Sequence, residues 1–174
     1  MYDHHAIIVI TGIQAAGKST VARLLAERFP RGVHIEADAL QRMIVAGADW
    51  VDQPGPPHGE AERQLRLRLT HMALLARSFF DAGFTVVLDD IILGDRYHHL
   101  VAGLHGYPFS LIVLAPVLAT VRQRDRDRPK RTLGDAWASY LDTELHATMR
   151  DTGIWIDNTN QTPDETVNAI IRRL

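Results

Sequence analysis

Apolar residues along this chain fall into short continuous runs, which alternate with longer stretches at helical spacing. The short runs are rich in β-branched and other apolar residues, so each predicts a buried strand. The five predicted strands are residues 7–10, 33–36, 84–88, 109–114 and 153–156. Apolar strands that alternate with helices indicate a parallel sheet covered on both faces. The pattern therefore predicts a three-layer α/β fold with a five-stranded parallel sheet.

Apolar residues at spacings of three and four predict a helix after each strand. The predicted helices are residues 18–29, 37–44, 60–82, 95–103, 117–125, 135–149 and 163–174. In the long helix, the stripe expected to face the core is Leu65, Leu69, Met72, Leu75 and Phe79. Three prolines between residues 47 and 59 exclude a regular element there.

The turn after the first predicted strand carries a complete phosphate-loop motif, Gly12-x-x-x-x-Gly17-Lys18-Ser19. The glycines allow positive φ angles and a close approach of the backbone to an anion. Backbone N–H groups and the following helix N-terminus then attract phosphate, Lys18 reaches the β- and γ-phosphates, and the Ser19 hydroxyl binds Mg²⁺. The motif predicts binding of a nucleoside triphosphate. The residues expected to hold it are Gly12, Gln14, Ala15, Ala16, Gly17, Lys18, Ser19 and Thr20.

Acidic residues follow two of the other predicted strands, where they should face the phosphate loop. Asp89 and Asp90 come directly after the third strand, and either could hold Mg²⁺, because the sequence does not fix which one faces the loop. Asp38 follows the second strand and has two interpretations. It could be the N-cap of a helix, or the general base that deprotonates an acceptor hydroxyl.

A basic segment follows the fourth predicted strand, and its cations are Arg122, Arg124, Arg126, Arg128, Lys130 and Arg131. Arg124, Arg128 and Arg131 are spaced so that they can share one helical face. A basic lid of this kind would neutralise charge on a transferred phosphoryl group and exclude water. The alternative is a solvated helix end, which the interleaved aspartates favour.

These motifs together resemble the chloramphenicol phosphotransferase-like kinases, within the adenylate-kinase-like group of P-loop enzymes. The matching stretches are residues 12–19, 38–40, 87–94, the arginines with Gly134, and 156–159. The resemblance implies ATP and Mg²⁺ as donor and cofactor, Asp38 as base, a lid at residues 122–134 and an acceptor-binding segment at 42–66. Residues 48–66 depart from the antibiotic kinase, so the resemblance does not extend to chloramphenicol as acceptor.

The resulting prediction is a single P-loop kinase domain over residues 1–174 that transfers the γ-phosphate of ATP to a hydroxyl of a small molecule. Residues expected near the acceptor are Asp38, Arg42, Trp50, Asp90 and Tyr97. A polynucleotide 5′-hydroxyl kinase and a nucleoside or nucleotide kinase stay open as alternatives. From another class, a P-loop NTPase switch or an ATP-binding regulatory module also stays open.

The composition limits which ligands, metal sites and cellular locations we expect for this protein. The formal net charge of −2 argues against broad contact with nucleic acid. The chain has no cysteine, so disulfides and thiolate metal sites are excluded. We find neither an apolar run of membrane-spanning length nor a secretory leader, and we therefore expect a cytoplasmic location.

Overall fold

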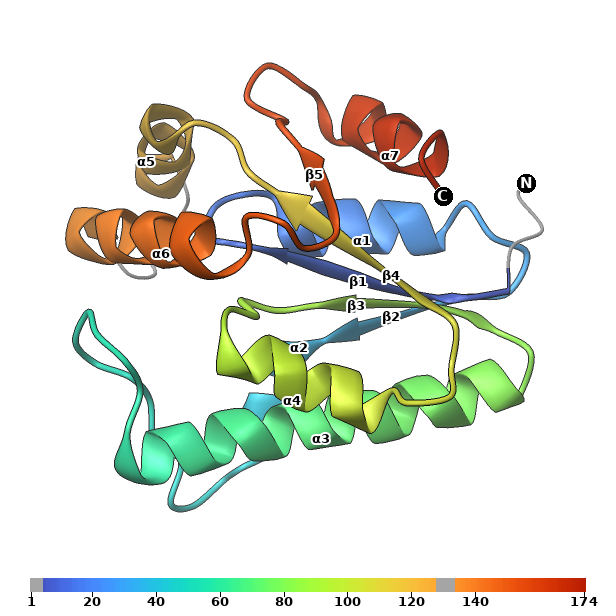
Figure 1. The fold of residues 1–174 in the computed structure, drawn as a ribbon, viewed down its shortest axis with the longest axis horizontal. Helices are drawn as coiled ribbons and strands as arrows, with labels where there is room; N and C mark the ends of the chain where they lie inside the picture. The colour runs from blue at the N-terminus through green and yellow to red at the C-terminus, as the bar shows by residue number, and fades with distance from the viewer. Residues whose placement is uncertain (1–4, 128–133) are drawn as a thin grey trace.

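The computed structural model describes residues 5–127 and 134–174 and contains a five-stranded, all-parallel sheet in the order β2-β3-β1-β4-β5 (Figure 1). The strands are β1 (Ile7–Gly12), β2 (Gly32–Glu36), β3 (Thr85–Asp89), β4 (Phe109–Leu114) and β5 (Ile154–Ile156). All five lie where the apolar runs predict them. The predicted α/β fold class is therefore confirmed.

Helices cover both faces of this sheet (Figure 1). On one face, α1 (Lys18–Ala26) and α7 (Pro163–Ile171) bury their apolar sides. The elements that contribute to the core on the other face are α2 (Ala37–Gln41), α3 (Gly59–Asp81), α4 (Asp95–Gly103), α5 (Leu118–Arg126) and α6 (Gly134–Thr148). None of the helices in the described part of the chain is long and apolar enough to cross a membrane.

Strand β1 lies in the middle of the sheet, between β3 and β4, and all six of its residues are buried. Ile8 and Ile10 pack in the layer of α1 and α7, whereas Ile7 and Val9 pack in the opposite layer. Because both faces of a central parallel strand meet helices, the strand is apolar from Ile7 to Ile10. Its carboxyl end, where the phosphate loop begins, is thus fixed by the core of the protein.

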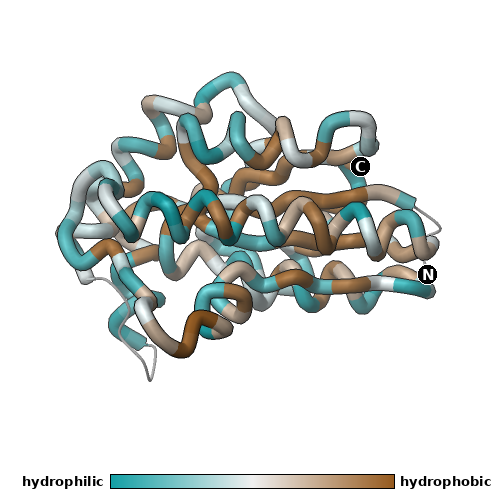
Figure 2. The backbone as a smooth tube through the Cα atoms, turned by 90° about the horizontal axis from the view of Figure 1, so that it is seen from below, coloured by the Kyte–Doolittle hydropathy of each residue, from teal (hydrophilic) through white to brown (hydrophobic). Residues whose placement is uncertain are grey.

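The long helix α3 is amphipathic, and its tube in Figure 2 alternates between teal and brown. The predicted apolar stripe is partly wrong, because Leu75 is 37% exposed. The buried face instead contains Leu69, Met72, Ala73 and Ala76. Alanines suit this face because α4 lies close: a Cβ on Gly103 would come within 2.8 Å of the Ala73 Cβ.

The helix after β2 is shorter than predicted, since α2 covers Ala37–Gln41 rather than residues 37–44. Its N-cap is Glu36, and none of the described side chains caps this end. Asp38 lies one position inside the first turn. The interpretation of Asp38 as the N-cap is therefore wrong, and its carboxylate is not used to cap α2.

Candidate active site

The loop between β1 and α1 has the backbone of an anion cradle. Ala15 and Gly17 have φ angles of 56° and 97°, in the left-handed region. Gly17 is the N-cap of α1, and none of the described side chains caps that end, so the N–H groups of the first turn remain for a ligand. At Gly12, an added Cβ would lie 2.5 Å from the carbonyl oxygen of Leu114, so only glycine fits there.

Side chains from distant segments hold this loop in place. The Asn158 amide donates from Nδ2 to the carbonyl oxygen of Ala16 at 3.0 Å and is buried. Arg124 donates to the carbonyl oxygen of Asn158 at 2.9 Å, so α5 contacts the same turn after β5. The Lys18 ammonium lies against the loop itself, 2.9 Å from the carbonyl oxygen of Ile13. The loop is thus held by a contact of its own, from Lys18 to Ile13, and by Asn158 from the turn after β5.

Asp89, the last residue of β3, and Asp90, which follows it, point to opposite faces of the sheet, as successive strand residues do. Asp89 lies on the α1 side, where its Oδ2 accepts a hydrogen bond from the Ser19 hydroxyl at 2.7 Å. Asp90 lies on the α3 side, where its Oδ1 accepts from the Arg68 guanidinium at 2.8 Å. The sequence left open which of the two carboxylates faces the phosphate loop. In the structure, Asp89 is the one beside Ser19.

Arg68 joins two carboxylates of the site. Its side chain is 8% exposed and lies between buried Asp90 and Asp38, whose Oδ1 is 3.9 Å from Nη1 of Arg68. Burial raises the pKa of Asp90, and the negative charge of Asp38 acts in the same direction, whereas Arg68 and Lys18 oppose the rise. The side chain of Asp38 is 61% exposed. Asp38 therefore has one oxygen directed toward a buried cation and remains accessible to a ligand.

A cleft of about 890 Å³ opens between these groups and the helices α2, α3 and α6. The predicted site residues among its lining are Gln14, Ala15, Gly17, Lys18, Ser19, Asp38, Arg42, Trp50, Asp89 and Asp90. Among the described residues, the predicted site positions outside the lining are Gly12, Ala16, Thr20, Tyr97 and Arg124. Tyr97 packs half-buried against the core, which is why it does not reach the cleft. Arg128 and Arg131 lie outside the described residues.

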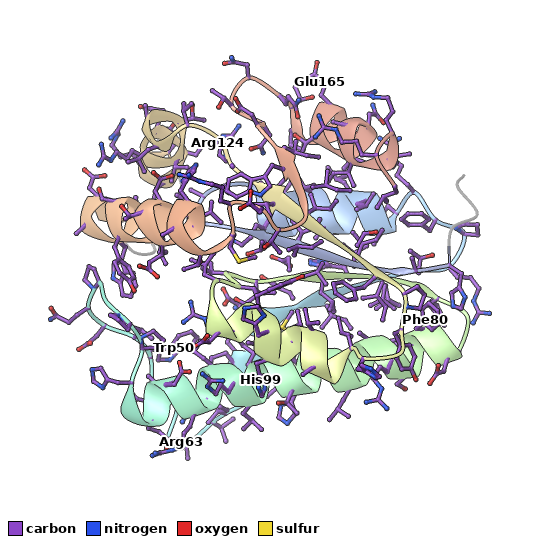
Figure 3. All side chains as sticks on the ribbon, viewed as in Figure 1. Trp50, Arg63, Phe80, His99, Arg124 and Glu165 are labelled. Atoms are coloured by element: carbon purple, nitrogen blue, oxygen red, sulfur yellow. The ribbon has the colours of Figure 1, made fainter. Side chains whose placement is uncertain are left out.

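One wall of the cleft is formed by the connecting loop (residues 42–58) between α2 and α3. Buried Gln64 fixes this loop: its Oε1 accepts from the backbone N–H of Asp49 and from Gln41, and its Nε2 donates to the carbonyl oxygen of Gly47. Trp50 follows directly and is 53% exposed on the cleft side of α3 (Figure 3). The loop is thus held by specific contacts and presents an aromatic surface to the cleft.

Sequence reasoning missed three residues of this assembly: His34, Gln64 and Arg68. Asn158 lies in the matching stretch 156–159, but it was given no role. The sequence does contain a sign that Arg68 is buried. Arg68 lies three residues after Leu65 and four before Met72, so it is a charged residue on the predicted apolar stripe. Gln64, one position before Leu65, borders the same stripe. For His34 the partner is 55 residues away in sequence, and no local pattern indicates the contact.

Mg²⁺ fits the donors at the carboxyl end of β3. The Ser19 hydroxyl and the Asp89 carboxylate are hard oxygen donors, the type that Mg²⁺ prefers. In the described part of the chain, no group of three or more histidine, aspartate or glutamate side chains is placed to bind a metal ion. A Mg²⁺ ion here would accordingly take further oxygens from phosphate and water, as is usual for this ion.

The family model described as AAA domain matches residues 7–153, which include the phosphate loop, Asp89 and Asp90. This chain belongs to that family. A comparison with curated proteins gave no match.

Solved structures share the whole fold. The chain is similar to a sugar kinase from Janibacter sp. HTCC2649, with a TM-score of 0.71, 20% identity, and coverage of 96% of this chain and 92% of that chain. It is similar to the Deinococcus radiodurans tunicamycin resistance protein, with a TM-score of 0.68, 22% identity, and coverage of 97% and 94%. It is also similar to the Mycobacterium tuberculosis APS kinase CysC in complex with AMPPNP and APS, with a TM-score of 0.67, 17% identity, and coverage of 96% and 95%. At these identities the similarity establishes a shared P-loop kinase fold. The reaction that this chain catalyses depends on the residues of its own site.

Proposed function

We propose that this protein is an ATP-dependent phosphotransferase that moves the γ-phosphate of ATP to a hydroxyl of a small molecule. The observation that carries the proposal is the accessible carboxylate of Asp38 in the same cleft as the phosphate loop. A protein that only binds or hydrolyses ATP does not need a carboxylate directed at a second ligand. The similar kinase structures support this class, and because they are kinases of different kinds they leave the acceptor open.

The phosphate-loop side would bind the donor. Backbone N–H groups of Ala15 and of residues 17–19 would hold the phosphates. The Lys18 ammonium would move from the carbonyl oxygen of Ile13 to the β- and γ-phosphates. Mg²⁺, held beside Ser19 and Asp89, would neutralise charge on the β- and γ-oxygens. Arg124, Arg128 and Arg131 remain candidates for the lid over the phosphates, and Arg124 already contacts the turn that supports the loop.

Asp38 would bind and orient the acceptor. Its carboxylate accepts a hydrogen bond from the acceptor hydroxyl, whose oxygen then bonds to the γ-phosphorus while the bond from phosphorus to the β,γ-bridging oxygen breaks. The proton passes to Asp38, and ADP leaves with the bridging oxygen. Because such transition states are loose, the carboxylate mainly positions the nucleophile and takes the proton late. The Arg68 guanidinium, 3.9 Å from Oδ1 of Asp38, would help to orient this carboxylate for the task.

The residues of the connecting loop and of α3 that line the cleft favour a small acceptor that has an apolar part. Trp50, Val51, Pro56, Pro57 and Leu65 line this part of the cleft. Two of its cations are already paired, Arg66 with Glu62 at 2.6 Å and Arg42 with Glu36 at 3.7 Å. Such a wall suits an apolar surface and a few hydrogen bonds better than a long polyanion. This weakens the polynucleotide kinase alternative, as does the net charge of −2.

The proposal is tested by incubating the protein with [γ-³²P]ATP, Mg²⁺ and a panel of hydroxyl compounds: phenicols, aminoglycosides, nucleosides, sugars and DNA ends. We expect label to move to one small-molecule class and to stay in ATP with the variant Lys18→Ala. Acceptor-independent release of labelled phosphate at the same rate would favour the NTPase switch instead. Label transfer only to DNA ends would favour the polynucleotide kinase.

A further inference from the structure

Asp89 uses both of its carboxylate oxygens, and its second partner lies outside the phosphate-loop motif. Oδ2 accepts from the Ser19 hydroxyl at 2.7 Å, and Oδ1 lies 2.6 Å from Nε2 of His34. The Asp89 side chain is 4% exposed and that of His34 is 17% exposed. The contact is therefore built into the sheet and shielded from solvent.

The sheet register explains why His34 reaches this carboxylate. His34 pairs with Val87 on the neighbouring strand, and Asp89 is two residues further along β3. Residues two apart on a strand point to the same face, so His34 and Asp89 both face the α1 side. With Asp89 as an ionised carboxylate, which can only accept, the Nε2 atom of His34 would donate this hydrogen bond.

We infer that His34 is a positioning residue for Mg²⁺ binding, because it holds Oδ1 of Asp89 and turns Oδ2 toward Ser19 and the metal. This inference rests on the proposed function, which assigns Asp89 to Mg²⁺. A carboxylate with one oxygen fixed loses less rotational freedom when the other binds a metal or a metal-bound water. Partners of this kind outside the ligand set typically change metal affinity by about 10–100-fold when removed.

The test measures Mn²⁺ binding in the presence of ADP by electron paramagnetic resonance, with no phosphoryl transfer involved. For His34→Ala we expect the Kd for Mn²⁺ to rise about 10–100-fold. The affinity for ADP without metal should stay unchanged, because His34 lies outside the lining of the cleft. His34→Gln keeps an N–H donor at a similar distance from the backbone, and its Kd should stay within about threefold of the wild-type value.

His5→Ala is the matched control. The Nε2 atom of His5 also makes a side-chain hydrogen bond, to the carbonyl oxygen of Phe80 at 2.8 Å, but at the opposite end of the sheet from Arg124 (Figure 3). It should leave Mn²⁺ binding unchanged. A wild-type Kd for Mn²⁺ in folded His34→Ala would overturn the inference, as would an equal loss in folded His34→Gln. If His34→Ala does not fold, His34→Gln against His34→Leu gives the same comparison.

The same titration separates this inference from the proposed function. Wild-type protein that binds Mn²⁺ with ADP, together with an unaffected His34→Ala variant, would remove only the role of His34. Wild-type protein that binds neither ADP nor Mn²⁺ would overturn the inference and the proposed function together.

Discussion

The phosphate-loop side of the cleft and the proposed acceptor side, formed by α2, α3 and the connecting loop, are stabilised by different kinds of contact. The phosphate loop depends on backbone geometry: two left-handed residues, a glycine against the Leu114 carbonyl, and an uncapped helix end among the described residues. The acceptor side depends on side chains that meet across the fold, chiefly Arg68 with Asp90 and Gln64 with Gln41. These pairs are 22 and 23 residues apart. The phosphate-loop motif can be recognised from local sequence, although Asn158 supports the loop from 142 residues away, whereas the pairs on the other side form only once α3 has packed.

This difference predicts that substitutions on the proposed acceptor side lower the free energy of unfolding. Arg68→Met leaves Asp90 buried without its cation, and removing one partner of a buried pair costs about 3–5 kcal/mol. We expect the free energy of unfolding, measured with urea, to fall by that amount. Arg68→Met combined with Asp90→Asn should recover most of it, because no unpaired charge is left buried.

Arg63→Met on the same helix is the control for this comparison. Arg63 pairs with Glu60 at the surface, so its loss should cost less than about 1 kcal/mol. Equal effects of Arg63→Met and Arg68→Met would mean that the buried pair does not organise the acceptor side.

On the phosphate-loop side, Lys18→Ala should lower the rate of phosphoryl transfer without lowering the stability of the fold. We expect phosphoryl transfer to fall by about 10²–10³-fold, the usual effect of removing one charge-stabilising donor. The melting temperature should change little, because Lys18 lines the cleft rather than the core. Arg23→Ala, which changes an exposed cation on the same helix, is the control. Undiminished turnover in Lys18→Ala would contradict the assignment of the phosphate loop.

Arg124→Ala tests whether the basic segment acts on the phosphates. If Arg124 neutralises charge in the transition state, kcat should fall by about 10²-fold with a smaller change in ATP affinity. Arg126→Ala is the matched control, since Arg126 is hydrogen-bonded to Gln123 at the surface of the same helix. A change in kcat below about threefold for Arg124→Ala would instead favour a solvated helix end held to the turn at Asn158.

The smallest expected effect comes from releasing the connecting loop. Gln64→Ala removes the hydrogen bonds to Gly47 and Asp49, so Trp50 loses its fixed position. We expect KM for the acceptor to rise about tenfold, corresponding to roughly one net hydrogen bond. KM for ATP should stay constant, and Gln123→Ala should change neither. Equal changes in both KM values would show that the two sides of the cleft are not independent.

The contrast between the two sides also explains what could be predicted from the sequence. Strands and the phosphate loop follow from local composition and spacing, and they lie where we predicted them. The N-cap at Asp38 and the stripe through Leu75 were wrong, because a cap depends on where β2 ends and the stripe on how closely α4 approaches α3. Arg68 and His34 act through partners that only the sheet and helix packing bring near. The roles of the predicted site residues stay predictions until variants are measured.

The measurement that tests the central claim most directly compares wild-type protein with Asp38→Asn. Asparagine has nearly the same size but cannot take a proton, so ATP affinity and melting temperature should stay almost unchanged. Acceptor-dependent ADP release should fall at least about 10²-fold, the usual contribution of a positioned base. Equal ADP release by the two proteins would contradict the account: Asp38 would then not act on the acceptor, and the cleft would be a nucleotide-binding site without phosphotransfer.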